Sequence, residues 1–162
     1  MRVDTLYFDV VRSLYHLALA VLVGGGLVLG AATAPAIFAT VRSRGEAGSI
    51  FGAVLARWDG LAILCVIVLV ITSALMAGVE ITGAPEARLV ARWVALAVLA
   101  ASVLYASGWA SPVARSIRAQ TPAWDDLPES APVRLEFAKM HRASSGAMRV
   151  GILAGLVAMF LS

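Results

Sequence analysis

Two histidines and a few methionines are the residues of this sequence best suited to bind a metal. His16 lies early in the first apolar run, and Met76 and Glu80 lie at the end of the second. Met159, near the end of the fourth run, could approach the same place. A neutral imidazole with thioether sulfurs suits copper(I) or a haem iron. These four residues form a candidate metal or haem site; the competing interpretation of each histidine is an interfacial residue bonded to backbone or water.

A second group of polar residues is spaced to share one face of a helix near the end of the sequence. It consists of His141, Ser145, Met148 and Arg149. An arginine near a helix end can extend its charge to the lipid head groups. Arg149 is interpreted either in that way or as a functional charge within the membrane. In the second case we expect it to be satisfied within the fold, with Asp59, freed carbonyls or hydroxyl groups as candidate partners.

The sequence favours a protein without catalysis of its own. Antiparallel helices would place His16 and His141 at opposite membrane faces, roughly 20 Å or more apart, so one haem cannot bind both. No hydrolase triad, phosphate loop, dinucleotide fingerprint or carboxylate pair occurs in the sequence. The single cysteine, Cys65, excludes an intramolecular disulfide.

The elements that must position these residues are membrane-spanning helices. Hydrophobic residues make up 60% of the sequence and charged residues only 14%, whereas an ordinary globular domain is about a quarter charged. Three apolar runs reach the roughly 20 residues that a bilayer span needs, and a fourth reaches it if Arg149 is accepted within the span. The sequence predicts an all-α, up-down-up-down bundle forming one integral membrane domain over 1–162, with spans near 13–40, 60–80, 93–114 and 142–162. Apolar residues at helical spacing also predict an interfacial amphipathic helix over 47–58, before the second span.

Within the first span, small residues and a proline define the expected packing. Gly26 and Gly30 form a GxxxG pair, which lets helices approach closely. Packing inside the bundle is preferred to a dimer seam as its explanation. Pro35 follows, and it is expected to kink or end the regular helix because proline lacks a backbone N–H.

Basic residues are distributed unequally between the two predicted ends of the bundle. The end with the termini and the second loop holds four, whereas the end with the other two loops holds eight, with Arg149 just inside. The expected location is the cell (inner) membrane. The positive-inside rule places the second end of the bundle in the cytoplasm and both termini outside the cytoplasm. Because the basic residues form no continuous patch with interleaved aromatics, nucleic acid is not an expected partner. Membrane lipids are expected partners, and a second copy of the chain, in a homo-oligomer, is a further candidate.

Two short motifs carry a resemblance to a known family. The first comprises Ala34, Pro35 and Phe38, followed by Ala47, Gly48, Phe51 and Gly52, and the second comprises Phe137, Met140, His141 and Ser144. With these residues, nearly the whole chain resembles the transmembrane protein 205-like family, called domain of unknown function 4149 in bacteria. The sequence departs from the pattern at Met148, where an asparagine would be expected. The resemblance implies a fold and a membrane location. More remotely, His16 followed by glycines and Pro35 is similar to copper-resistance D-type proteins and haem-binding HemJ-type protoporphyrinogen oxidases.

Three classes of function remain open at this point. The favoured one is a small polytopic membrane protein, non-catalytic, acting in membrane organisation or in small-solute or metal handling. The second is a haem- or copper-binding membrane protein, including a redox enzyme. The third is an oligomeric transporter or channel, which would need several copies because four tightly packed helices leave little lumen.

Overall fold

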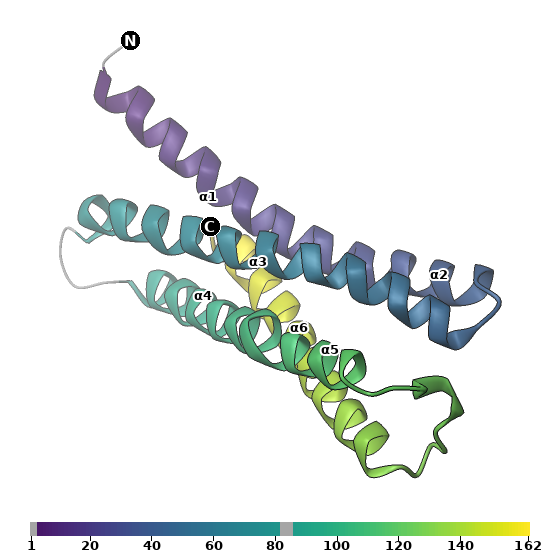
Figure 1. The fold of residues 1–162 in the computed structure, drawn as a ribbon. Helices are drawn as coiled ribbons and strands as arrows, with labels where there is room; N and C mark the ends of the chain where they lie inside the picture. Colours follow the sequence, from purple (N-terminus) through teal and green to yellow (C-terminus); the bar gives the residue numbers. More distant parts are fainter. Residues whose placement is uncertain (1–2, 82–85) are drawn as a thin grey trace.

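The computed structural model describes residues 3–81 and 86–162, and the regular elements within these ranges are all helical (Figure 1). The elements in chain order are α1 Val3–Val28, the π-helical turn η1 Leu29–Thr33, α2 Ala34–Thr40, α3 Arg44–Glu80, α4 Ala87–Tyr105, the π-helical turn η2 Ala106–Ala110, α5 Ser111–Ala119, the short 3-10 helix η3 Trp124–Asp126 and α6 Pro132–Leu161.

These elements form four long helical rods. The segments α1, η1 and α2 follow one another without a break, as do α4, η2 and α5, while α3 and α6 are single helices. Each rod is long and apolar enough to cross a membrane. Successive rods run in opposite directions (Figure 1). The predicted all-α, four-span, up-down-up-down bundle is therefore confirmed.

The segment 47–58 differs from its prediction as a separate interfacial helix. It forms the first turns of α3, a continuous helix of 37 residues and so roughly 55 Å long at 1.5 Å per residue. A bilayer core is only about 30 Å thick, so this segment prolongs the second span. The start of α3 is fixed by Ser43, whose hydroxyl accepts a hydrogen bond from the Glu46 N–H at 3.0 Å, satisfying one of the free donors of the first turn.

Two prolines are accommodated by the π-helical turns rather than by helix ends. The turn η1 stops two residues before Pro35, and η2 stops two residues before Pro112. A proline removes one helical hydrogen bond and clashes with the carbonyl four residues earlier, and a wider π turn gives that carbonyl room. Regular α-helix ends before η1, as expected from Pro35, but the rod itself continues to Thr40.

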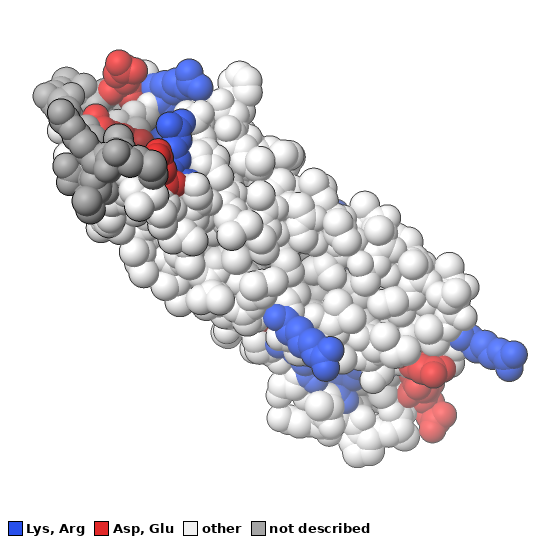
Figure 2. Space-filling view, turned by 90° about the horizontal axis from the view of Figure 1, so that it is seen from above, with Lys and Arg blue, Asp and Glu red and all other residues white. Residues whose placement is uncertain are grey.

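The core of the bundle lies between two pairs of rods. Helix α1 packs mainly on α3 and α4 mainly on α6, and contacts between α1 and α6 join the pairs. Tyr15, Leu19, Leu99 and Val103 are the largest side chains fully buried there. Many large apolar side chains face outward instead, up to Phe160 at 82% exposure. Figure 2 shows an uncharged band between two charged ends, which is the surface expected of a chain immersed in lipid.

The two glycines of the predicted GxxxG pair have different surroundings. Gly26 faces α6, where an added Cβ would lie 2.9 Å from Ile152 Cδ1, whereas nothing lies within 4 Å of the corresponding point at Gly30. Gly26 thus supports packing inside the bundle, which was the preferred interpretation. Gly30 takes no part in that contact.

Candidate functional site

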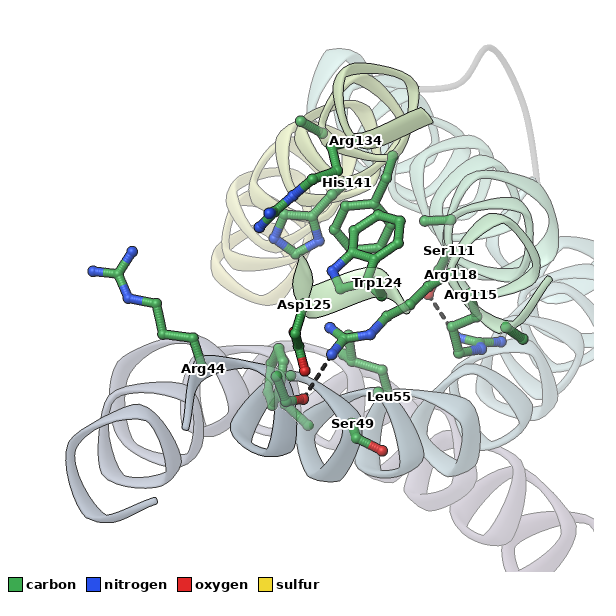
Figure 3. A pocket seen from close by; sticks show the side chains of 18 of the residues that line it. Arg44, Ser49, Leu55, Ser111, Arg115, Arg118, Trp124, Asp125, Arg134 and His141 are labelled. Atoms are coloured by element: carbon green, nitrogen blue, oxygen red, sulfur yellow. Dashed lines mark hydrogen bonds between the residues drawn. The ribbon is translucent and has the colours of Figure 1, made fainter. Parts of the chain in front are cut away.

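A cavity of about 790 Å³ lies at the end of the bundle where the starts of α3 and α6 meet α5 and η3 (Figure 3). This volume is within the range of small-molecule binding sites. Its apolar lining comes from aromatic and aliphatic side chains that include Phe38, Phe51, Leu55 and Phe137. Its polar lining comprises Arg44, Ser49, Ser111, Arg115, Arg118, Asp125, Glu129, Arg134 and His141. We call this space the arginine cavity, because four arginines face only two acids in its lining.

One of these arginines is held by an ion pair. Arg115 Nη1 lies 2.5 Å from Asp59 Oδ2 and also donates to Ser111 Oγ at 2.7 Å. The Asp59 side chain is only 8% exposed and that of Arg115 is 30% exposed. A buried carboxylate needs such a partner, since an unpaired charge away from water is costly. Asp59, one of the candidate partners of Arg149, is thus bound by Arg115 instead.

Two further arginines hold the short helix η3 in place. The guanidinium groups of Arg118 and Arg134 each lie 5.6 Å from the centre of the Trp124 ring, within the range of cation–π attraction. Arg118 also donates to the Gly45 carbonyl at 2.6 Å, and Arg134 donates to the Leu127 carbonyl at 2.5 Å. Figure 3 shows Trp124 between these two arginines. The loop between α5 and α6 is thereby tied to both α3 and α6.

Small residues on α3 make room for this arrangement. A Cβ added at Gly45 would overlap the Asp125 carboxylate, and one added at Gly48 would overlap the Arg118 guanidinium. A larger residue at either position would require the side chain of Asp125 or Arg118 to shift. The two glycines therefore let these side chains lie close to α3.

Most of the arginine cavity was missed by reasoning from the sequence, although its signals were present. Six residues of the two motifs that carry the family resemblance line it: Phe38, Gly48, Phe51, Gly52, Phe137 and His141. The excess of basic residues at this end was also visible. What the sequence could not show is that segments more than 70 residues apart close around one space.

The polar stripe predicted on the last helix does not form a single site. His141 lines the arginine cavity and stacks on Phe137, with ring centres 5.9 Å apart and planes 2° from parallel. Ser145, Met148 and Arg149 are not part of that lining. Met148 packs against the hydrophobic core, and Arg149 is exposed without a hydrogen bond or ion pair to any residue that the structure describes.

A second, smaller cavity of about 180 Å³ lies at the opposite end and contains three of the four predicted metal or haem ligands. His16, Met76 and Glu80 line it, together with Arg12, Tyr15, Arg92 and Ser162. Met159 is not in the lining and is 43% exposed. Within residues 3–81 and 86–162, no group of three or more histidine, cysteine or acidic side chains is placed to hold a metal ion.

Two of these residues also bond to other groups of the protein. The Glu80 carboxylate forms an ion pair with Arg92, and His16 Nδ1 bonds to the Arg12 carbonyl at 2.8 Å. Arg92 also lies 5.9 Å from the centre of the Tyr15 ring. Arg12 and Arg92 were not predicted to belong to this site. They contributed only to the count of basic residues at this end of the bundle.

The four apolar rods, the uncharged band and the charged ends define a multi-pass membrane protein. The family model described as "Domain of unknown function (DUF4149)" matches residues 17–123. The chain therefore belongs to this family, as the resemblance implied, and the match extends from within α1 to Ala123, the residue before η3, so that it covers the first of the two motifs but not the second. No curated protein and no solved structure matches the chain.

Proposed function

We propose that this chain is a non-catalytic membrane protein that binds an anionic amphiphile in the arginine cavity. By this we mean a molecule with a negatively charged head group and an apolar tail. The observation that carries the proposal is the lining itself, in which four arginines lie beside a wall of aromatic and aliphatic side chains.

The charges of the cavity match a phosphate or carboxylate group. Arginine presents its N–H groups in a planar fork that fits the oxygens of such anions. Arg115 is neutralised by Asp59, but Arg44 extends from the start of α3 without a bond to any described residue. Arg118 and Arg134 use one N–H each for a backbone carbonyl, which leaves their other donors for a ligand.

The apolar wall matches the tail of such a ligand. Phe38 of α2 and Phe51 of α3 meet edge to face, with ring centres 6.2 Å apart, and Trp124 meets Phe137 in the same way at 5.1 Å. These rings offer an apolar surface that an acyl chain can cover. The tail of an amphiphile would then contact the rings while its head group contacts the arginines.

The proposed orientation places this cavity beside an abundant source of the ligand. The positive-inside rule puts the arginine-rich end in the cytoplasm and both termini outside. The cytoplasmic leaflet of cell membranes carries anionic lipids that attract basic segments. An anionic membrane lipid is therefore the favoured occupant, in keeping with a role in membrane organisation, and a soluble organic anion is the alternative.

Native mass spectrometry of the detergent-purified protein tests this function. Anionic phosphatidylglycerol and zwitterionic phosphatidylcholine with identical acyl chains would be compared as ligands. We expect the anionic lipid to bind at least about tenfold more tightly and Arg134→Gln to lose about that factor, since a charge-assisted hydrogen bond contributes about 1.5–3 kcal/mol. Bound lipid should be recovered chemically unchanged.

The matched control is Arg142→Gln, which removes an exposed charge of the same helix outside the cavity lining. It should bind the anionic lipid as the parent does. Equal binding of both lipids, or equal losses in the two variants, would contradict the proposal. Tight binding of a short-chain phosphate ester that competes with the lipid would instead identify a soluble anion as the ligand. Thermal unfolding of each ligand-free variant shows whether it is folded.

A further inference from the structure

The smaller cavity, at the end opposite the arginine cavity, is built around a buried arginine with an unused donor. Arg92 is 8% exposed, and its Nε–H has no hydrogen-bond partner among the residues that the structure describes. One of its terminal nitrogens is bound by Glu80. A buried N–H without a partner costs free energy comparable to a lost hydrogen bond, so this donor points to a missing acceptor.

The hydroxyl groups that line the cavity have no free proton to donate to such an acceptor. The Ser162 hydroxyl donates to the Ala158 carbonyl at 2.6 Å, so the Tyr15 hydroxyl must donate to Ser162 Oγ, 3.0 Å away. Their protons are thus used within the protein. The guanidinium groups of Arg92 and Arg12 remain as the free donors in the lining.

The charge and the size of the cavity restrict its ligand further. Two arginines and one glutamate line it, and the glutamate is taken by Arg92, so the surplus charge is positive. A water molecule occupies about 30 Å³ in the liquid. A cavity of about 180 Å³ therefore holds a few waters or one small anion, and it is below the roughly 300 Å³ at which sites for drug-sized molecules begin.

From these observations we infer that this cavity binds a small monovalent anion, of the size of chloride or formate, on Arg92 and Arg12. The inference is independent of the proposed function, because it concerns other residues at the other end of the bundle. It also reverses the role of Glu80. In a cation site this carboxylate would be a ligand, whereas here it competes with the anion for Arg92.

The test measures the thermal unfolding midpoint of the purified protein in detergent at constant ionic strength. Chloride or formate would replace gluconate, an anion too large for this space, and isothermal titration calorimetry would give the affinity. We expect a saturable rise of the midpoint for the parent. Glu80→Gln should bind chloride about tenfold more tightly, because it removes a negative charge next to the site. Arg12→Gln should bind it more weakly, and Arg92→Lys should lose the saturable effect.

Two controls separate this site from the rest of the molecule. Glu136→Gln removes an exposed acid on α6 and should leave the affinity for chloride unchanged. Arg134→Gln should also leave it unchanged, whereas a loss in that variant would assign the anion to the arginine cavity and overturn the inference. Arg12 is exposed at the rim, so its variant keeps the test informative if Arg92→Lys does not fold.

Two other results would also overturn the inference. If unfolding does not depend on the kind of anion, the cavity holds only water. If copper(I) or zinc(II) binds saturably and Glu80→Gln weakens that binding, the site takes a cation.

Discussion

Replacing either member of the ion pair between Asp59 and Arg115 should destabilise the protein far more than replacing both. Asp59→Leu leaves a cation with a 30% exposed side chain, whereas Arg115→Met leaves a carboxylate that is 8% exposed. Breaking a buried pair costs about 3–5 kcal/mol. We expect about 3 kcal/mol for Asp59→Leu, because water reaches the remaining guanidinium, and about 5 kcal/mol for Arg115→Met.

The double variant, which combines Asp59→Leu with Arg115→Met, is the informative one. A protein with an apolar pair of similar volume is often as stable as one with a buried ion pair, or more stable. We therefore expect the free energy of unfolding of the double variant to lie within about 1 kcal/mol of the parent's. The measurement is reversible unfolding in mixed micelles with increasing dodecyl sulfate, followed by circular dichroism. Arg57→Met is the control, since this arginine is exposed on α3 and has no bond to a described residue; its effect should stay within about 0.5 kcal/mol.

Two results would refute this reasoning. Additive effects of the single changes would mean that the side chains do not interact in the protein. A larger effect for Asp59→Leu than for Arg115→Met would mean that the remaining guanidinium, and not the remaining carboxylate, is the more poorly solvated group.

Three further predictions concern other parts of the bundle. The free energies of unfolding of Arg149→Leu and Arg149→Lys should both lie within about 0.5 kcal/mol of the parent's, because this exposed side chain has no bond to a described residue. A clear loss of stability in the leucine variant alone would reveal a partner. Gly25→Ala should cost about 1–3 kcal/mol in the same unfolding assay, since its Cβ would press into a buried indole ring, while Gly24→Ala, with open space around it, should be neutral or slightly stabilising. Cysteine labelling in intact cells should find a probe at Asp125 in the cytoplasm and one at Ser162 outside, and the reverse pattern would refute the proposed orientation.

The fold could be predicted from the sequence because it depends on properties that are local. Runs of apolar residues between charges set the spans, and the lengths of the connections set the antiparallel order. The missed detail, the continuity of α3 through 47–58, has a local cause as well. The Ser43 cap fixes where that helix begins, and nothing interrupts it before Glu80.

The sites could be predicted only in part because they depend on how separate helices align. Asp59 was recognised as a candidate partner of Arg149, but its actual partner, Arg115, is set by the relative positions of α3 and α5, which periodicity does not give. Likewise, His16, Met76 and Glu80 line one cavity. Arg92 lies in the same cavity and changes the sign of the charge there. Its position depends on how the helices pack, which the sequence pattern does not give.

The two π turns have a consequence for insertions and deletions in this family. A π turn holds one residue more than an α turn, and it therefore takes up the rotation of about 100° that an added residue would give a regular helix. Losing a single residue within Leu29–Thr33 would close this turn to an α turn and leave Phe38 facing the arginine cavity. Pro35 would then clash with the carbonyl four residues earlier, so such a deletion should be tolerated only together with loss of the proline. Relatives that differ by one residue at η1 or η2 should thus keep the same neighbours beyond the turn, although their residue numbers are shifted by one.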